Sequence, residues 1–134
     1  MLSRSVLVLC AFTASFLAPG SAIASERTLV CQYEKHPAVF LGESIMRPRG
    51  KHTYVIGKNG TAKHKNRVMS GRISETRIDL FDTYEQKSKE GVPLTYKNTV
   101  MIDLSSGQYS RFSQIIKRKK IIYNEIVDGQ CFSA

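Results

Sequence analysis

Hydrophobic and polar residues alternate with a period of two along much of the chain. In the stretch "TYKNTVMIDL", Tyr96, Val100 and Ile102 fall on one face. Lys97 and Asp103 fall on the opposite face. Because successive side chains of a strand point to opposite sides of a sheet, this alternation predicts a half-buried β-strand.

Three further segments, "TLVCQYE", "HTYVIG" and "TRIDLFDTY", alternate in the same way and also predict strands. The residues expected on their buried faces are Leu29, Cys31, Tyr33, Tyr54, Ile56, Ile78, Leu80 and Tyr84. Turn-forming residues separate the segments at 57–60, 91–93 and 105–107. The polar segment "TYEQKSKEGVP" is compatible with a loop or with a single helical turn.

No helical stripe appears anywhere in this pattern, and most connections are short. The pattern therefore predicts an all-β domain, either a small antiparallel meander barrel or a sandwich, of about seven or eight strands. We favour the barrel because closure removes exposed strand edges.

The first 24 residues have the layout of a cleavable secretory signal peptide. A single cation, Arg4, precedes an apolar stretch over residues 6–18, and "PGSAIA" ends the segment with small residues. Cleavage after Ala24 would leave residues 25–134 as a single β-rich domain that is periplasmic or secreted. We expect no transmembrane segment in this mature chain.

The mature chain would keep two cysteines, Cys31 and Cys131. In an oxidising compartment such a pair predicts a disulfide, whereas a redox pair would favour Cys-x-x-Cys spacing. The bridge would close a loop of about 100 residues, which the chain-entropy model values at roughly 4.7 kcal/mol.

The formal net charge of the chain is +9, and signal cleavage would remove only one of these charges. Four cations are consecutive in "QIIKRKKIIY", where they form the tip of a predicted hairpin or the outer face of one long strand. Charge of this kind keeps an exported protein soluble and guards strand edges, or it binds an anionic partner. For an anion-binding surface the candidate residues are Lys117, Arg118, Lys119 and Lys120, assisted by Lys63, Lys65 and Arg67.

The sequence offers little catalytic chemistry. His36, His52 and His64 lack the close spacing of zinc ligand pairs, and no Gly-x-Ser-x-Gly elbow occurs. Asp79 and Asp82 lie three residues apart in a predicted strand, so they should point to opposite faces. We therefore expect no enzymatic activity, no cofactor and no metal site.

The chain resembles small bacterial periplasmic β-barrels in its export signal, its early Cys31, the stretch "IDLSSGQY" and the terminal "GQC". Among these it is similar to the C-type lysozyme inhibitors, which present a Ser-Gly-x-x-Tyr loop to the cleft of the enzyme. The resemblance implies a protein-binding loop at Ser106, Gly107 and Tyr109, with a spacing one residue shorter than that motif.

Two functional hypotheses follow from these observations. The first is an exported non-enzymatic binding protein with a basic surface that contacts anionic components of the cell envelope. The alternative is a periplasmic protein-binding module of the lysozyme-inhibitor kind, which depends on residues 106–109.

Overall fold

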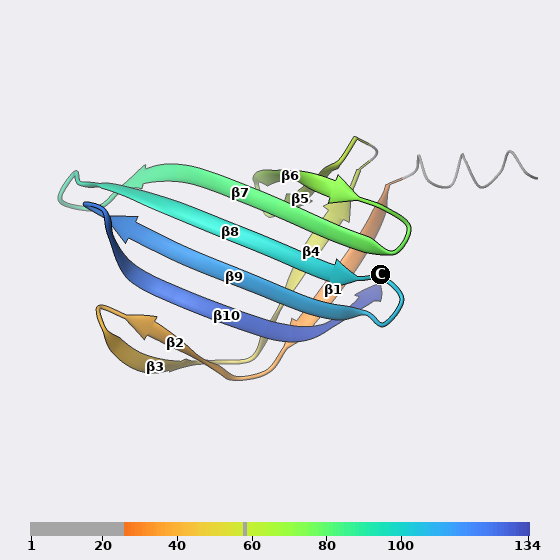
Figure 1. Ribbon diagram of the computed structural model, residues 1–134, viewed down its shortest axis with the longest axis horizontal. Coiled ribbons are helices and arrows are strands. Elements are labelled where there is room, and N and C mark those ends of the chain that lie inside the picture. The colour runs from red at the N-terminus through yellow and green to blue at the C-terminus, as the bar shows by residue number, and fades with distance from the viewer. Residues whose placement is uncertain (1–25, 58) are drawn as a thin grey trace, which may run out of the picture.

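A computed structural model describes residues 26–57 and 59–134, and the predicted signal peptide lies outside these residues (Figure 1). The described residues contain no helix. The strands are β1 (Arg27–Tyr33), β2 (His36–Phe40), β3 (Glu43–Arg47), β4 (Gly50–Ile56), β5 (Thr61–His64), β6 (Arg67–Ile73), β7 (Arg77–Lys87), β8 (Pro93–Asp103), β9 (Gln108–Lys117) and β10 (Lys120–Ser133).

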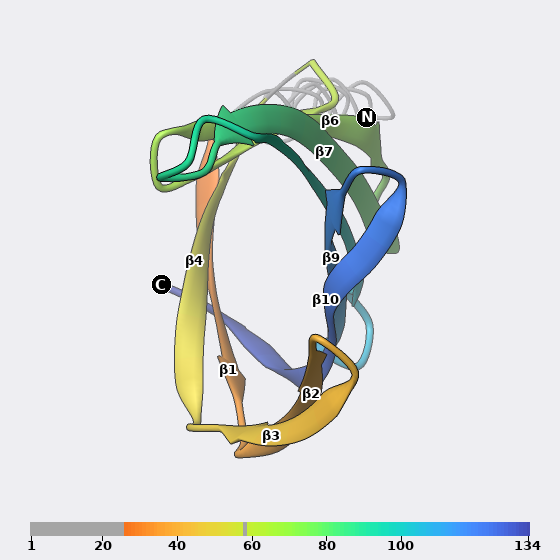
Figure 2. The same ribbon diagram turned by 90° about the vertical axis from the view of Figure 1, so that its left-hand side faces the viewer.

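The strands form a closed antiparallel barrel of eight strands, which confirms the barrel favoured from the sequence, and two extra strands that the sequence did not predict. The sheet runs in the order β1-β4-β5-β6-β7-β8-β9-β10, and β1 closes the ring by pairing with β10. Figure 2, turned by 90° from Figure 1, shows these strands as a ring. Closure leaves no long unpaired edge in this ring.

The extra strands β2 and β3 extend the β1–β4 pair beyond the ring. Strand β10 pairs with β1 through its last residues and with β2 through residues 123–125. Strand β3 pairs with β2, just as β4 pairs with β1. The breaks fall at residues 34–35 and 48–49, where Pro48 cannot donate a ladder hydrogen bond.

The apolar core fills one half of the barrel. Its most buried members come from strands all around the ring: Leu29, Cys31, Tyr54, Ile56, Ala62, Met69, Ile78, Leu80, Val100, Ile102, Tyr109 and Val127. The turn residues 59–60, 74–76 and 104–107 lie at this end, which we call the closed end. The period-two prediction of inward residues is confirmed for Leu29, Tyr54 and Leu80.

The predicted disulfide joins Cys31 to Cys131. These residues lie directly opposite each other on β1 and β10, at the seam where the last strand meets the first. Close by, Gly129 faces Tyr33 across the same pair of strands. A Cβ atom at Gly129 would lie 1.8 Å from the carbonyl oxygen of Gln32, so only glycine allows β1 and β10 to approach this closely.

The segment "TYEQKSKEGVP" is neither a loop nor a helical turn over most of its length. Strand β7 continues to Lys87, and only residues 88–92 form the turn to β8. The turn is held by hydrogen bonds from the N–H of Ser88 to the carbonyl of Val92 (2.8 Å) and from the N–H of Gly91 to the carbonyl of Ser88 (2.9 Å). None of the described residues belongs to a helix long and apolar enough to cross a membrane.

Candidate functional site

Three turns lie together at the end of the barrel opposite the closed end. They are residues 41–42 between β2 and β3, 88–92 between β7 and β8, and 118–119 between β9 and β10. Figure 1 shows all three at the left of the molecule. We call this the hairpin end.

The basic stretch "KRKK" forms a tight hairpin at this end, which excludes the continuous strand. Lys117 pairs with Lys120, so Arg118 and Lys119 alone make the turn. Their φ angles are +51° and +66°. Positive φ at both central residues is the mark of a type I′ turn, which normally contains Asn-Gly because other residues are strained there.

The charges of this turn are poorly compensated. Lys117 lies 3.9 Å from the carboxylate of Glu90 in the β7–β8 turn. Within residues 26–57 and 59–134, no ion pair forms to Arg118, Lys119 or Lys120. All three side chains are exposed, so the tip projects an uncancelled positive charge.

An open groove separates the β9–β10 turn from the β7–β8 turn. It has a volume of about 500 Å³ and is lined by Arg118 and Lys119 together with Gly91, Val92, Pro93, Thr95 and Ile116. Cationic side chains therefore border a mainly apolar lining. Such a groove can accept a group that is anionic at one end and apolar at the other.

The neighbouring β2–β3 turn presents an apolar tip. Leu41 has a φ of +51° and an exposed fraction of 64%. Its backbone N–H donates a hydrogen bond of 2.8 Å to the carbonyl of Ile122, two residues after Lys120. The apolar tip is thereby fixed to β10 beside the basic one.

The second basic group expected at the site, Lys63, Lys65 and Arg67, lies elsewhere. Lys65 forms part of the β5–β6 turn, which Figure 1 shows set well back from the hairpin end. Arg67 donates two hydrogen bonds to Asp82, at 2.8 and 3.1 Å, and its guanidinium covers the ring of Tyr84 at 3.8 Å. The charge of Arg67 is therefore compensated by Asp82. The structure does not bring Lys63, Lys65 and Arg67 to residues 117–120.

The turn that the resemblance singled out lies at the closed end. Ser106 is exposed and Gly107 has a φ of +81°, as a turn requires. Tyr109, however, points into the barrel with an exposed fraction of 0%. Its hydroxyl lies 2.6 Å from that of Tyr54. The ring of Tyr109 is therefore part of the core and is not presented to a partner.

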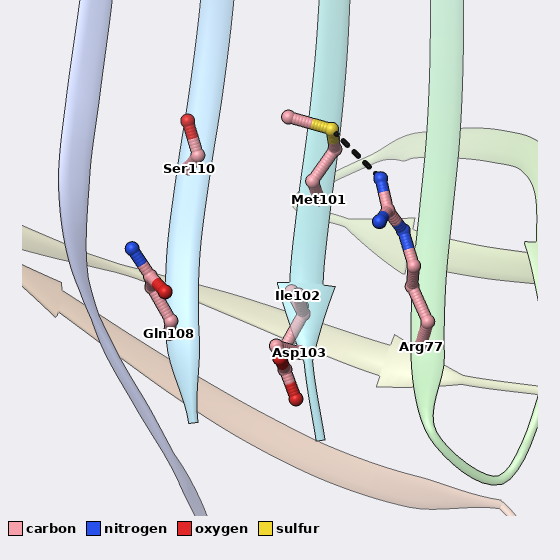
Figure 3. Close-up of a pocket in the computed structure, with 6 residues that line it drawn as sticks. All are labelled: Arg77, Met101, Ile102, Asp103, Gln108 and Ser110. Carbon is pink, nitrogen blue, oxygen red and sulfur yellow. Dashed lines mark hydrogen bonds between the residues drawn. The ribbon is translucent and has the colours of Figure 1, made fainter. Parts of the chain in front are cut away.

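A shallow hollow of about 230 Å³ lies on the outer surface next to this turn (Figure 3). Arg77 reaches over it from β7, but its Nε donates to both carboxylate oxygens of Asp79 at 3.0 Å, and Nη2 contacts the sulfur of Met101. Asp103 accepts hydrogen bonds from Ser105 and Ser106, which lower the pKa of its carboxyl. Both charged groups are thus engaged locally, and we assign no ligand to this hollow.

A cluster of polar aromatic and histidine side chains inside the barrel was not foreseen from the sequence. All three histidines of the chain belong to it. The ring of Tyr33 lies 5.4 Å from that of His36 and 4.8 Å from that of His52, and His52 lies 5.0 Å from His64. His36 also pairs with the carboxylate of Glu125. The sequence carried one indication of this cluster. His52 lies two residues before the inward Tyr54, and His64 lies two residues after the inward Ala62.

Hydrogen bonds within this cluster join strands that are not neighbours in the sheet. His52 Nδ1 lies 2.7 Å from the Tyr109 hydroxyl, and Arg111 donates from Nη1 to the Tyr54 hydroxyl at 2.9 Å. His52 and Tyr54 lie on β4, whereas Tyr109 and Arg111 lie on β9. The network therefore braces the barrel across its interior.

The protonation states of this cluster suit a structural brace. Burial and then the positive charge of Arg111 lower the pKa of His52 to about 3, and burial also lowers the pKa of His64. Burial raises the pKa of the Tyr109 hydroxyl. At neutral pH the two imidazoles are uncharged and the hydroxyl keeps its proton. Among the described residues, no three His, Cys, Asp or Glu side chains are grouped to hold a metal ion.

Comparisons with protein-family models, with curated proteins and with solved structures found no match. The resemblance to lysozyme inhibitors therefore stays a prediction.

Proposed function

We propose that the chain is an exported, non-enzymatic binding protein that attaches to an anionic component of the cell envelope through the β9–β10 turn. The observation that carries this proposal is the backbone conformation and the exposed, uncompensated charge of Arg118 and Lys119. Both hold a left-handed backbone conformation at an exposed tip, and neither has an acidic partner within the described residues.

Two physical arguments support a binding role for this tip. A left-handed conformation costs roughly 1–2 kcal/mol for a residue other than glycine, so the turn is a less stable choice than Asn-Gly. Strain of this kind is concentrated at functional sites. The type I′ geometry also holds Arg118, Lys119 and Lys120 beyond the barrel wall, where an anionic surface can approach them.

The test is retention of the oxidised mature protein on immobilised polyphosphate at low and moderate salt. In one variant Arg118, Lys119 and Lys120 are changed to Gln. The matched control changes to Gln three exposed cations that lie outside the turns of the hairpin end: Arg49, Lys51 and Lys63.

Each cation near an anionic surface contributes about 1 kcal/mol, so the tip variant should bind roughly a hundredfold more weakly at low salt. The control variant carries the same net charge and should retain most of its binding. Equal losses in the two variants would show that only the overall charge matters and would overturn the proposal.

A further inference from the structure

The hairpin end carries exposed apolar side chains next to its cations. Leu41 is 64% exposed, Ile121 is 53% exposed and Phe40 is 44% exposed. Ile121 directly follows Lys120 and pairs with Ile116 across β9 and β10. These side chains lie at or beside the tips of two adjacent hairpins, where the fold leaves much of their apolar surface exposed to solvent.

The conformation of Leu41 makes its position more informative. Its turn has φ values of +51° at Leu41 and +83° at Gly42, so it is a second type I′ turn. A branched aliphatic residue is unfavourable at the first central position, where Asn is preferred. The hydrogen bond from the N–H of Leu41 to Ile122 fixes this apolar tip beside the basic one.

The charges around these tips are mainly positive. The cations on and beside the turns of the hairpin end are Lys87, Lys89, Lys117, Arg118, Lys119 and Lys120. Only Glu43 and Glu90 oppose them on the same turns, and Glu90 already faces Lys117. The end therefore combines a positive potential with exposed aliphatic groups.

From this combination we infer that the anionic component is the surface of a lipid bilayer, which the hairpin end meets end-on. Arg118, Lys119 and Lys120 contact the headgroup phosphates, and Leu41 and Ile121 enter the boundary between headgroups and acyl chains. The groove beside the basic turn accepts part of a phospholipid molecule, with the phosphate at Arg118 and Lys119 and the first methylenes of an acyl chain against Pro93 and Ile116. This inference rests on the proposed function, since it names the anionic component.

A bilayer fits these features better than a soluble polyanion does. A polyanion can neutralise the cations but has no apolar phase for Leu41 and Ile121. At a bilayer surface, apolar burial and attraction to anionic headgroups act together, and neither alone gives firm attachment.

The absence of tryptophan from the sequence allows a direct test. Leu41→Trp places a single fluorophore at the apolar tip, and Ile126→Trp places one on the same strand as Ile121, about 16 Å further along β10. Ile126 is 57% exposed, so both sites tolerate the larger ring. The probes are mixed phosphatidylglycerol–phosphatidylcholine vesicles, with and without brominated acyl chains.

We expect the emission of Leu41→Trp to shift to shorter wavelength on the vesicles and to be quenched by the brominated chains. Soluble polyphosphate should cause neither change, and Ile126→Trp should not respond to either probe. If Leu41→Trp binds the vesicles with unchanged emission, or if both variants respond equally, the end-on bilayer inference is wrong.

Two substitutions separate this inference from the proposed function. Leu41→Asn and Ile121→Thr should each weaken binding to the mixed vesicles by about tenfold, because each removes an inserted aliphatic group. Retention on polyphosphate should stay unchanged in both, and Ile126→Thr should leave both measurements unchanged. Leu41→Asn should also unfold at no lower temperature than the parent, since Asn suits the left-handed position.

The outcomes are distinguishable. If the apolar variants bind vesicles like the parent while polyphosphate retention still depends on residues 118–120, the bilayer inference fails and the proposed function stands. If neither vesicles nor polyphosphate binding depends on residues 118–120, both fail.

Discussion

The strained β9–β10 turn makes a prediction in which stability and binding change in opposite directions. The change is the double substitution Arg118→Asn with Lys119→Gly, which installs the pair preferred in type I′ turns. Because both residues already have positive φ, the backbone need not move. The variant should be more stable than the parent and should bind anionic surfaces more weakly.

The size of the stabilisation follows from the two left-handed residues. Each costs roughly 1–2 kcal/mol when the side chain has a Cβ atom. Glycine at 119 removes this cost but gives back about 0.4–1 kcal/mol through the added freedom of the unfolded chain. Asparagine at position 118 removes only part of the cost of the left-handed conformation there. The net gain should be about 1–2 kcal/mol, which raises the Tm of a domain of this size by about 4–8 °C.

The assay is thermal and urea unfolding of the oxidised protein, followed by circular dichroism. The control is Arg118→Gln with Lys119→Gln, which removes the same two charges and keeps both Cβ atoms. We expect this control to change Tm by less than about 2 °C, because relief of like-charge repulsion at a solvated turn is small. If the Gln pair stabilises as much as the Asn-Gly pair, charge repulsion and not backbone strain limits the stability of the turn.

Two further predictions concern the interior and the seam of the barrel. The pKa of His52 is lowered to about 3 in the folded state against about 6.5 in the unfolded chain, so the contribution of His52 to stability is constant above pH 6.5 and falls as the pH decreases from 6.5 towards 3. At pH 5 the full pKa shift would lower the free energy of unfolding by about 2 kcal/mol. Because the ring keeps partial contact with solvent, we expect a decrease of about 1 kcal/mol. His52→Gln should flatten the urea-unfolding free energy over this range, and an unchanged slope would exclude His52 as its origin. Replacing Cys31 and Cys131 with Ala should cost about 2–5 kcal/mol of unfolding free energy. Reductant should lower the Tm of the parent and leave that of the double variant unchanged, and a reductant-sensitive double variant would contradict this.

The sequence was sufficient to predict the strands that separate the core from solvent. Leu80, Val100 and Ile102 follow the period of two of a half-buried strand and are all fully buried, although the outward positions beside them include the exposed Phe81 and Met101. Asp79 and Asp82 point to opposite faces as predicted, where they bind Arg77 and Arg67 respectively. The barrel was favoured because closure removes strand edges, and the disulfide was predicted from the pair of cysteines in an exported chain.

The sequence was not sufficient to predict the strands, or parts of strands, that extend beyond the core. Every residue of β3 is exposed, so the segment Glu43–Arg47 has no buried face that could set a period of two. The end of β7 is similarly polar, and residues 85–87 are exposed. Backbone pairing alone maintains these strands, and pairing depends on a partner that the local sequence does not reveal.

The interior polar network was missed for a different reason. Tyr109, Arg111 and Ser113 are spaced two residues apart and share the inward face of β9, so this part of the face looks polar in the sequence although it lines the barrel. His52 and Tyr54, the hydrogen-bond partners of Tyr109 and Arg111, lie more than 50 residues away in sequence, on a strand that does not pair with β9. Only the closed ring brings these side chains together.

The location of the strained residues bears on how the two ends of the barrel differ. Among the described residues, four other than glycine have positive φ: Leu41, Lys65, Arg118 and Lys119. Three of them belong to the hairpin end. At the closed end the residues with positive φ are Gly60 and Gly107, which adopt this conformation without strain. If turn geometry were the only requirement at the hairpin end, Asn or Gly would satisfy it there as well. An aliphatic and two cationic side chains occupy these positions instead, so substitutions that relieve the strain of these turns also remove the proposed membrane contacts.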